Sequence, residues 1–129
     1  MKKKKLVLAI DFDGTIVNTD DWTCWEKPVI LGLREGAKEY IQKLHDDGHT
    51  IIINTCRDAH NLALCIDYLE QEGVYYDLVN SNTPEHIARF KRDGRKVLAD
   101  FYIDDKNILG IPSWKEIYEI VTKASIIND

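Results

Sequence analysis

A short run of apolar residues that ends in two carboxylates constrains the fold of this chain more than any other feature. Residues 6–10 are all apolar, a run too short for an ordinary helix but long enough for a buried strand. Asp11 and Asp13 follow, and strand alternation places both carboxylates on the same side of the chain. Two like charges this close repel each other unless a cation or a shared proton compensates. Gly14 permits a tight turn whose backbone amides can cradle an anion, so this stretch predicts metal-assisted phosphate chemistry.

The size and composition of the chain indicate one cytoplasmic domain. A chain of 129 residues with 44% hydrophobic content can fill one core, so we expect a single domain over residues 1–129. Three cysteines without CxxC spacing fit a reducing compartment better than a disulfide framework. Residues 2–5 are lysines that imitate the start of a signal peptide, but Asp11 interrupts the apolar run that follows, and no stretch reaches the length of a membrane span. We interpret these lysines as a solvated start of the chain, with a nucleic-acid or membrane patch as the alternative.

The net charge argues against indiscriminate binding to nucleic acid. The chain carries a formal charge of −5 with a pI near 5.3, whereas binding to a polyanion requires a broad basic surface. A local basic cluster occurs nonetheless, formed by Arg89, Lys91, Arg92, Arg95 and Lys96. This cluster could bind the phosphate of a nucleotide, a nucleic-acid end or a sugar, or it could be a solvated loop.

In the first half of the chain, apolar periodicity predicts strands that alternate with helices. Residues 16–33 lack periodicity and predict a loop or a small hairpin. Helical spacing runs from Leu33 to Leu44, with Gly48 as a stop, and a second buried strand is predicted at residues 50–53. The helix that follows ends at Gly73, and its predicted buried stripe consists of Ala59, Leu62, Ala63, Ile66 and Leu69.

The second half of the chain continues the alternation. Residues 75–80 predict a weaker strand, and Thr83 with Pro84 resembles the start of a helix. Residues 97–103 predict a strand that ends at an acid pair. The last helix has a capping box and an apolar stripe, formed by Ser113 and Glu116 and by Trp114, Ile117, Tyr118 and Val121.

This alternation predicts an α/β fold, a three-layer Rossmann-like domain with a central parallel sheet covered on both faces. Ligands of such sheets bind beyond the carboxyl ends of the strands. The polar residues that follow three of the predicted strands therefore meet on one rim: Asp11 and Asp13, Thr55, and Asp104 and Asp105. Because Mg²⁺ prefers oxygen ligands, Asp11 and Asp105 together with a substrate phosphate would be a sufficient site.

Several of these residues also have structural interpretations. Asp104 and Asp105 taken alone are typical of a turn, and Thr55 could cap the next helix instead of donating to a phosphoryl oxygen. Lys96 is the preferred cation because it shortly precedes the strand that ends at Asp104. Three other cations are close enough in sequence to compete for this role: Lys91, Arg92 and Arg95.

The order of these residues resembles the four motifs of the haloacid dehalogenase superfamily. The first motif is the stretch from Asp11 to Thr15, DFDGT, and Thr55, Lys96 and the final acid pair follow in the family's order. The resemblance covers essentially the whole chain. It implies a phosphohydrolase that forms a covalent aspartyl phosphate, and Asp13 points to a phosphatase because transport ATPases of the family carry Thr there.

The resemblance also implies a role for each catalytic residue. Asp11 would attack phosphorus, and Asp13 would protonate the leaving oxygen and then activate water. Thr55 would donate to a phosphoryl oxygen, and Lys96 together with Mg²⁺ would offset charge on the equatorial oxygens.

Metal ligands and domain organisation follow from the same resemblance. Family members bind Mg²⁺ through the nucleophile, here Asp11, the backbone carbonyl of the second acid, here Asp13, and an acid of the last motif. Asp105 is favoured as the direct ligand and Asp104 as a water-mediated one, although the order could be reversed. Neither interval between motifs leaves room for a cap domain, so the chain resembles capless members. In such relatives the open site accepts large substrates or is covered by a neighbouring subunit of an oligomer.

Substrate-binding candidates surround the first motif. Trp22 and Trp25 lie in the loop that relatives use as a flap, and we expect at least one to contact substrate, with packing onto the domain as the alternative. Arg57 could bind a second anionic group of the substrate, with a surface salt bridge as the alternative. The turn supplies three further candidates, Phe12, Gly14 and Thr15. Small phosphorylated metabolites, such as nucleotides and sugar phosphates, rank above polynucleotide ends because of the net negative charge, and phosphoproteins rank third.

Other functional classes fit the residues less well. An EF-hand counted from Asp11 requires Gly and Glu where the chain has Ile16 and Trp22, and no Gly-rich phosphate-loop signature is present. A receiver domain would carry its phospho-accepting Asp after a middle strand, where this chain has Asn54 and Thr55. A non-catalytic phosphate-binding or regulatory module remains an alternative, which the complete set of acids disfavours.

Overall fold

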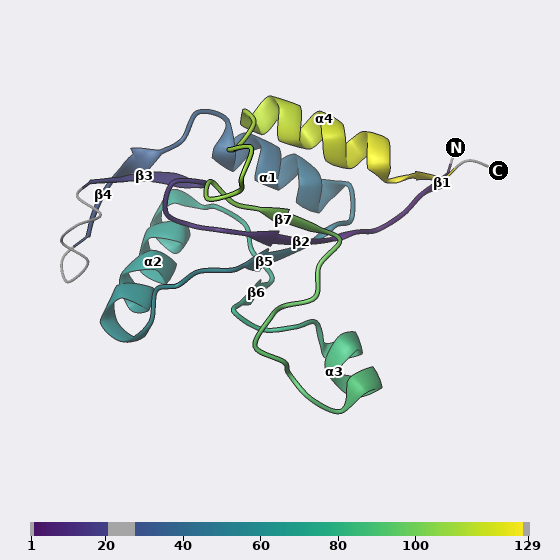
Figure 1. The fold of residues 1–129 in the computed structure, drawn as a ribbon. Helices are drawn as coiled ribbons and strands as arrows, with labels where there is room; N and C mark the ends of the chain where they lie inside the picture. Colours follow the sequence, from purple (N-terminus) through teal and green to yellow (C-terminus); the bar gives the residue numbers. More distant parts are fainter. Residues whose placement is uncertain (1, 21–27, 128–129) are drawn as a thin grey trace.

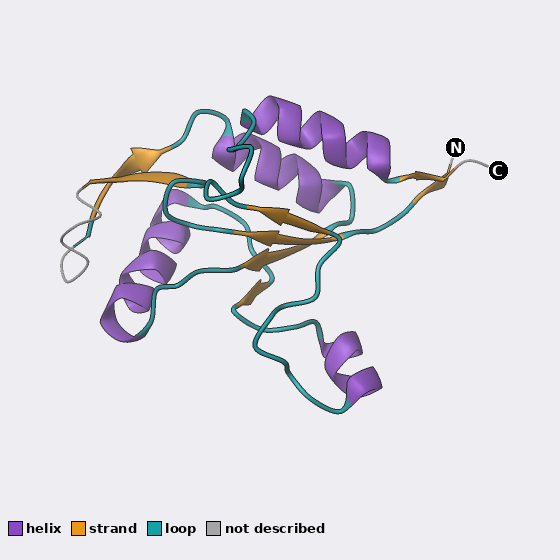
Figure 2. Ribbon diagram, in the orientation of Figure 1, coloured by secondary structure: helices purple, strands orange, loops and turns teal. Residues whose placement is uncertain are grey.

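A four-stranded parallel sheet forms the centre of the computed structural model, which describes residues 2–20 and 28–127 (Figures 1 and 2). The strand order is β6-β5-β2-β7. The strands are β2 (Val7–Ile10), β5 (Thr50–Ile53), β6 (Leu78–Val79) and β7 (Phe101–Ile103). The predicted α/β architecture with a parallel sheet is therefore confirmed.

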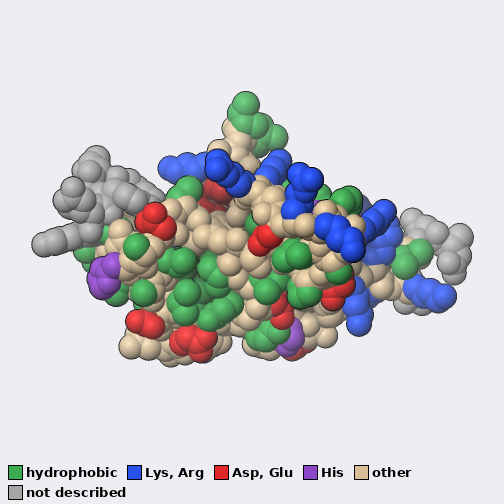
Figure 3. Space-filling model, turned by 90° about the horizontal axis from the view of Figure 1, so that it is seen from below, with side chains coloured by type: hydrophobic (Ala, Val, Ile, Leu, Met, Phe, Trp, Pro, Cys, Tyr) green, Lys and Arg blue, Asp and Glu red, His purple; other side chains and the backbone are tan. Residues whose placement is uncertain are grey.

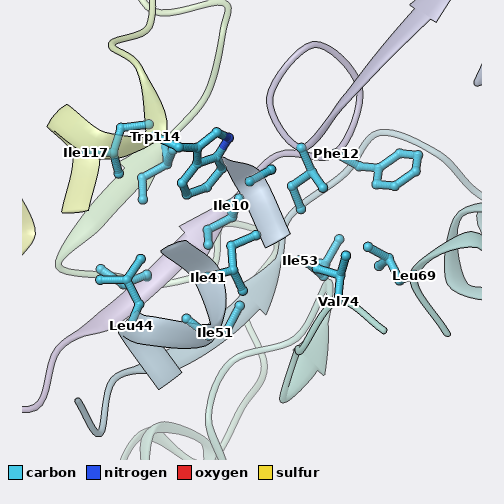
Figure 4. Close-up of a cluster of buried hydrophobic side chains, with 14 of the residues drawn as sticks. Ile10, Phe12, Ile41, Leu44, Ile51, Ile53, Leu69, Val74, Trp114 and Ile117 are labelled. Atoms are coloured by element: carbon cyan, nitrogen blue, oxygen red, sulfur yellow. The ribbon is translucent and has the colours of Figure 1, made fainter. Parts of the chain in front are cut away.

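The main core lies on one face of this sheet. Helices α1 (Ala37–Asp46) and α4 (Trp114–Ala124) lie side by side on that face, and α2 (Ala59–Glu72) adds two buried side chains to the same apolar cluster (Figure 1). Figure 4 shows Ile41 of α1 and Trp114 of α4 close to Ile10 of β2. The helical spacing of these residues gave the correct buried side for α1 and α4.

The opposite face of the sheet is covered by irregular chain rather than by a helix. Helix α3 (Pro84–Phe90) has no buried residue. A second, smaller core cluster consists of Ala9, Ile52 and Val97, with Ala99 packed against it. The prediction that residues 97–103 form one strand is wrong for its first four residues, because this segment crosses the sheet face before β7 begins.

The predicted hairpin is present in the segment between the first motif and α1. Strands β3 (Val17–Asp20) and β4 (Val29–Leu33) pair antiparallel, and Val17 lies opposite Leu33. The prediction that the next helix begins at Leu33 is therefore wrong. Gly36 adopts a φ of 80° just before the helix begins at Ala37, a backbone conformation that glycine tolerates readily.

The buried side of α2 differs from its predicted apolar stripe. Cys65 and Leu69 are its buried residues, whereas Ala59 and Ala63 are exposed. Apolar residues surround much of this helix, so their spacing did not identify one side. The predicted C-terminal end is correct, because Gly73 adopts the left-handed conformation directly after Glu72.

The helix caps and the chain ends complete the fold. Thr83 and Ser113 accept hydrogen bonds from the amides three residues later, as their sequences predict. Strand β1 (Lys2–Lys3) pairs antiparallel with β8 (Ile126–Ile127), so these two exposed lysines are part of a small sheet and not only a solvated start. Among the helices of the described residues, none has the length and apolar character needed to cross a membrane.

Candidate functional site

Three carboxylates converge at the carboxyl ends of β2 and β7. Asp11 follows β2, and Asp104 and Asp105 follow β7, and these two strands are parallel neighbours in the sheet. The amide of Asp11 donates to the carbonyl of Ile103 over 2.9 Å, which extends the strand pairing to the rim. One ligand oxygen from each of the three acids can be chosen so that all lie within 4.8 Å of one another. The structure thus brings together acids that are more than 90 residues apart in sequence.

These carboxylates border a cavity of about 120 Å³. Its lining residues are Asp11, Asp13, Thr55, Cys56, Asp104, Asp105 and Lys106. A larger cavity of about 530 Å³ lies between the first residues of α1 and α4, but its lining mixes cations with acids and includes no residue of the predicted motifs. The smaller cavity is the candidate site because the predicted metal-ligand and catalytic carboxylates line it.

The charge balance of the site is unfavourable without a cation. The pKa of Asp11 is raised from 3.8 to about 8, mainly because burial penalises its charged form, and further because of a hydrogen bond with Asp105 and the charge of Asp104. Lys106 lies 3.9 Å from a carboxylate oxygen of Asp105, but its side chain is largely exposed. Because all three acids offer oxygen donors and excess negative charge, they fit a hard divalent cation such as Mg²⁺.

Asp13 is held by a buried arginine. Its two carboxylate oxygens accept from Nε and Nη2 of Arg57, each over 2.7 Å, and Thr19 of β3 donates a further hydrogen bond. Arg57 is 1% exposed, and its Nη1 donates to the carbonyl of Asn61 in α2. The guanidinium lies 5.2 Å from the ring centroid of Phe12. Arg57 therefore connects the first motif to α2, instead of forming the surface salt bridge that was its alternative interpretation.

Thr15 and Gly14 support the last acid pair. The Asp105 amide donates to the Thr15 hydroxyl over 3.1 Å, and that hydroxyl lies 3.5 Å from an Asp105 carboxylate oxygen. A Cβ on Gly14 would overlap the Asp105 carboxylate, and Gly14 has a φ of 79°. The amides of Gly14 and Thr15 donate to Val17 and Phe12 within the turn, so the predicted anion cradle is not formed by these two amides here. Substrate binding by Gly14 and Thr15 stays a prediction.

Thr55 lies at the cavity and also organises the turn after β5. Its hydroxyl accepts from the amide of Arg57 over 3.1 Å. This bond closes the turn and does not cap the next helix, because the N-cap of α2 is Asp58. Asn80, which follows β6, exchanges two hydrogen bonds with the Thr55 backbone. The role of Thr55 toward phosphate stays a prediction, and Asn80 is a supporting residue that no sequence motif indicated.

The structure places the predicted cation away from the cavity. The Lys96 ammonium lies 5.0 Å from the ring centroid of Tyr102, and Lys106 is the cation that lines the cavity among the described residues. The only sequence signal that could have indicated Lys106 is its position directly after Asp104 and Asp105. The three competing cations, Lys91, Arg92 and Arg95, are exposed and do not line the cavity either.

The aromatic candidates have different outcomes. The Phe12 side chain is fully buried, edge-on to Tyr68 with ring centroids 6.3 Å apart, so only its backbone could contact a ligand. Trp22 and Trp25 lie outside the described residues. Cys56 lines the cavity and is an exposed free thiol, although sequence reasoning did not select it.

Comparison with known proteins identifies a structural relative. No protein-family model and no curated protein matches the chain. The solved structure of a conserved protein from Bacteroides thetaiotaomicron matches with a TM-score of 0.77 and 30% sequence identity, over 98% of this chain and 100% of that chain. The chain belongs to the same family as this Bacteroides protein. The Bacteroides relative is described only as conserved, so the similarity supports the fold and leaves the chemistry to the residues of the site.

Proposed function

We propose that this protein is a Mg²⁺-dependent phosphatase, a capless member of the haloacid dehalogenase superfamily that acts on small phosphomonoesters. The convergence of Asp11, Asp104 and Asp105 beside Asp13 carries this proposal. The three acids would hold the ion, and Mg²⁺ would supply compensation for their charge and for that of the phosphoryl oxygens.

The chain's own residues support a covalent reaction. A carboxylate oxygen of Asp11 attacks phosphorus and forms an acyl phosphate as the bond to the leaving oxygen breaks. Asp13 supplies the proton to that oxygen and then takes one from a water molecule. The water oxygen attacks phosphorus, which releases inorganic phosphate and regenerates Asp11. Arg57 and Thr19 hold the Asp13 side chain in place beside the cavity.

The intervals between the motifs support the capless assignment. Hairpin β3–β4 and α1 occupy the first interval, and α2, β6 and α3 occupy the second. None of these elements, in the part of the chain that is described, forms a separate domain. The net charge of −5 favours small substrates such as nucleotides or sugar phosphates over polynucleotide ends and phosphoproteins. A cytoplasmic location remains part of the proposal and rests on the cysteine count.

Phosphate release from a panel of phosphorylated compounds tests this function. The panel contains nucleotides, sugar phosphates and oligonucleotides with 3′- or 5′-phosphates, each with Mg²⁺ or with EDTA. We expect Mg²⁺-dependent turnover that Asp11→Asn abolishes. Asp67→Asn is the matched control, because it removes the same charge from an exposed position on α2. Retention of substantial activity by Asp11→Asn would refute the covalent mechanism, and Mg²⁺ binding without any turnover would favour a regulatory phosphate-binding module.

A further inference from the structure

A basic surface lies at the end of α3 and along the chain that follows it, outside the candidate site. We define the basic segment as residues 89–96, which contain five cationic side chains and one carboxylate in an otherwise acidic chain. Every residue of this segment is exposed. Figure 1 places α3 and the chain that follows it below the sheet, and Figure 3 shows that face, with Lys and Arg side chains gathered along its upper and right-hand parts.

The positive charges of the basic segment are not neutralised by neighbouring acids. Within the described residues, the ion pairs are those between Arg57 and Asp13 and between Lys106 and Asp105, so none involves the basic segment. Its single acid, Asp93, accepts hydrogen bonds from the amide and the side chain of Asn82. These bonds direct the carboxylate toward the protein, and the five cations remain available to an anionic partner.

Asn82 also fixes the shape of the segment. This side chain is 1% exposed and reaches both sides of the loop. Its Nδ2 donates to Asp93 over 2.8 Å and lies 3.4 Å from the carbonyl of Gly94, and its Oδ1 accepts from the amide of Leu98 over 2.7 Å. A loop held in this way loses less conformational entropy on binding than a free one, which favours a binding surface over a merely solvated loop.

Two partly exposed aromatic rings lie among these cations. Phe90 is 49% exposed, with the Arg89 guanidinium 5.3 Å from its ring centroid. Tyr102 of β7 is 37% exposed, with the Lys96 ammonium 5.0 Å from its ring centroid. Cations that track a phosphate backbone, combined with rings on which bases stack, are typical of surfaces that bind single-stranded nucleic acid.

We propose that the basic segment, with Phe90 and Tyr102, binds a single strand of nucleic acid. The phosphodiester groups contact the five cations, and unpaired bases stack on the two rings. The aromatic rings favour this partner over an acidic protein, whose carboxylates would need only the charges. Because the rest of the chain is strongly negative, the attraction is local and depends steeply on salt. The surface does not depend on the proposed phosphatase activity.

The experiment measures binding of a fluorescein-labelled oligothymidine of about 12 nucleotides, a length within the range of known single-strand sites. It uses the full chain in EDTA and an oligonucleotide without a terminal phosphate, so phosphatase chemistry does not contribute. Fluorescence anisotropy is recorded between about 50 and 200 mM salt. The test variant combines Arg92→Gln, Arg95→Gln and Lys96→Gln. The matched control combines Lys2→Gln, Lys3→Gln and Lys4→Gln, which removes the same charge from exposed lysines at the other end of the chain.

We expect saturable binding whose logarithmic salt slope is about −3.5 if all five cations contact phosphates. The test variant should reduce the magnitude of this slope by about 2 and weaken binding at least roughly tenfold at the lowest salt. The lysine control should bind like the wild type. Phe90→Ala should weaken oligothymidine binding by roughly fivefold or more, because it removes a stacking ring.

Three results would overturn the proposal. The first is the absence of saturable binding by the wild type at the lowest salt. The second is an equal loss of affinity in the lysine control and the test variant, because the affinity would then reflect net charge alone. The third is unchanged binding by Phe90→Ala together with equally tight binding of polyglutamate, which would identify an acidic-protein surface instead.

Discussion

Replacing Arg57 by methionine should destabilise the protein strongly, because it leaves a buried carboxylate without its cation. Asp13 is 3% exposed, and two of the three side-chain hydrogen bonds that it accepts from the described residues come from Arg57. Breaking a buried ion pair by removing one partner costs about 3–5 kcal/mol. A chain of 129 residues has an unfolding entropy of about 0.27 kcal/mol/K near its midpoint. The expected decrease in Tm is therefore roughly 11–18 °C.

Thermal unfolding followed by circular dichroism in EDTA measures this effect. The double variant Arg57→Met with Asp13→Asn should recover much of the loss, because no charge then remains buried at the pair. Arg89→Met is the matched control, since it removes an exposed arginine, and its Tm should stay within about 2 °C of the wild type. A decrease below about 4 °C for Arg57→Met, or a double variant no more stable than the single one, would refute this account.

Three further predictions concern the acids of the site. In EDTA, protonation of Asp11 stabilises the folded state fully below pH 3.8, and this contribution is lost as pH rises to about 8. The Tm of the wild type should therefore fall over this range relative to the Tm of Asp11→Asn. Parallel plots of Tm against pH for the two proteins would contradict this prediction. Gly14→Ala should displace Asp105 and weaken Mg²⁺ binding at least about tenfold in calorimetry, whereas wild-type affinity would show that Asp105 is dispensable. Asp13→Asn should lengthen the lifetime of a phosphoenzyme in a quench assay, and an unchanged lifetime would remove its acid–base role.

Local signals in the sequence were sufficient for much of the fold. The apolar run of β5 predicted its strand correctly because a strand buried on both faces is apolar at successive positions. The capping box of α4 predicted its helix correctly because Ser113 bonds an amide only three residues later. Sequence periodicity failed at positions where tertiary contacts determine the secondary structure. Leu33 continues the helical spacing of α1, yet it pairs with Val17 in a hairpin, and Val97 covers the sheet instead of extending β7.

The part of the site formed by residues that directly follow parallel strands could be predicted from the sequence. Asp11 and Asp104 follow parallel strands, so their convergence followed from topology. The burial of Arg57 was not predictable, because an arginine in a turn ordinarily faces solvent, and its carboxylate partner precedes it by 44 residues. The position of Lys96 over Tyr102 depends on the path of the loop after α3, which local spacing does not encode.

The pair formed by Asp13 and Arg57 has a consequence for the evolution of this family. Each residue alone is costly to change, because the partner left behind is buried, so substitutions at the two positions should be inherited together. A homologue that loses the carboxylate at the position of Asp13 would then come under pressure to exchange the arginine as well. The residue two positions after Thr55, which follows β5, would thus indicate, in any newly sequenced relative, whether the acid is still retained.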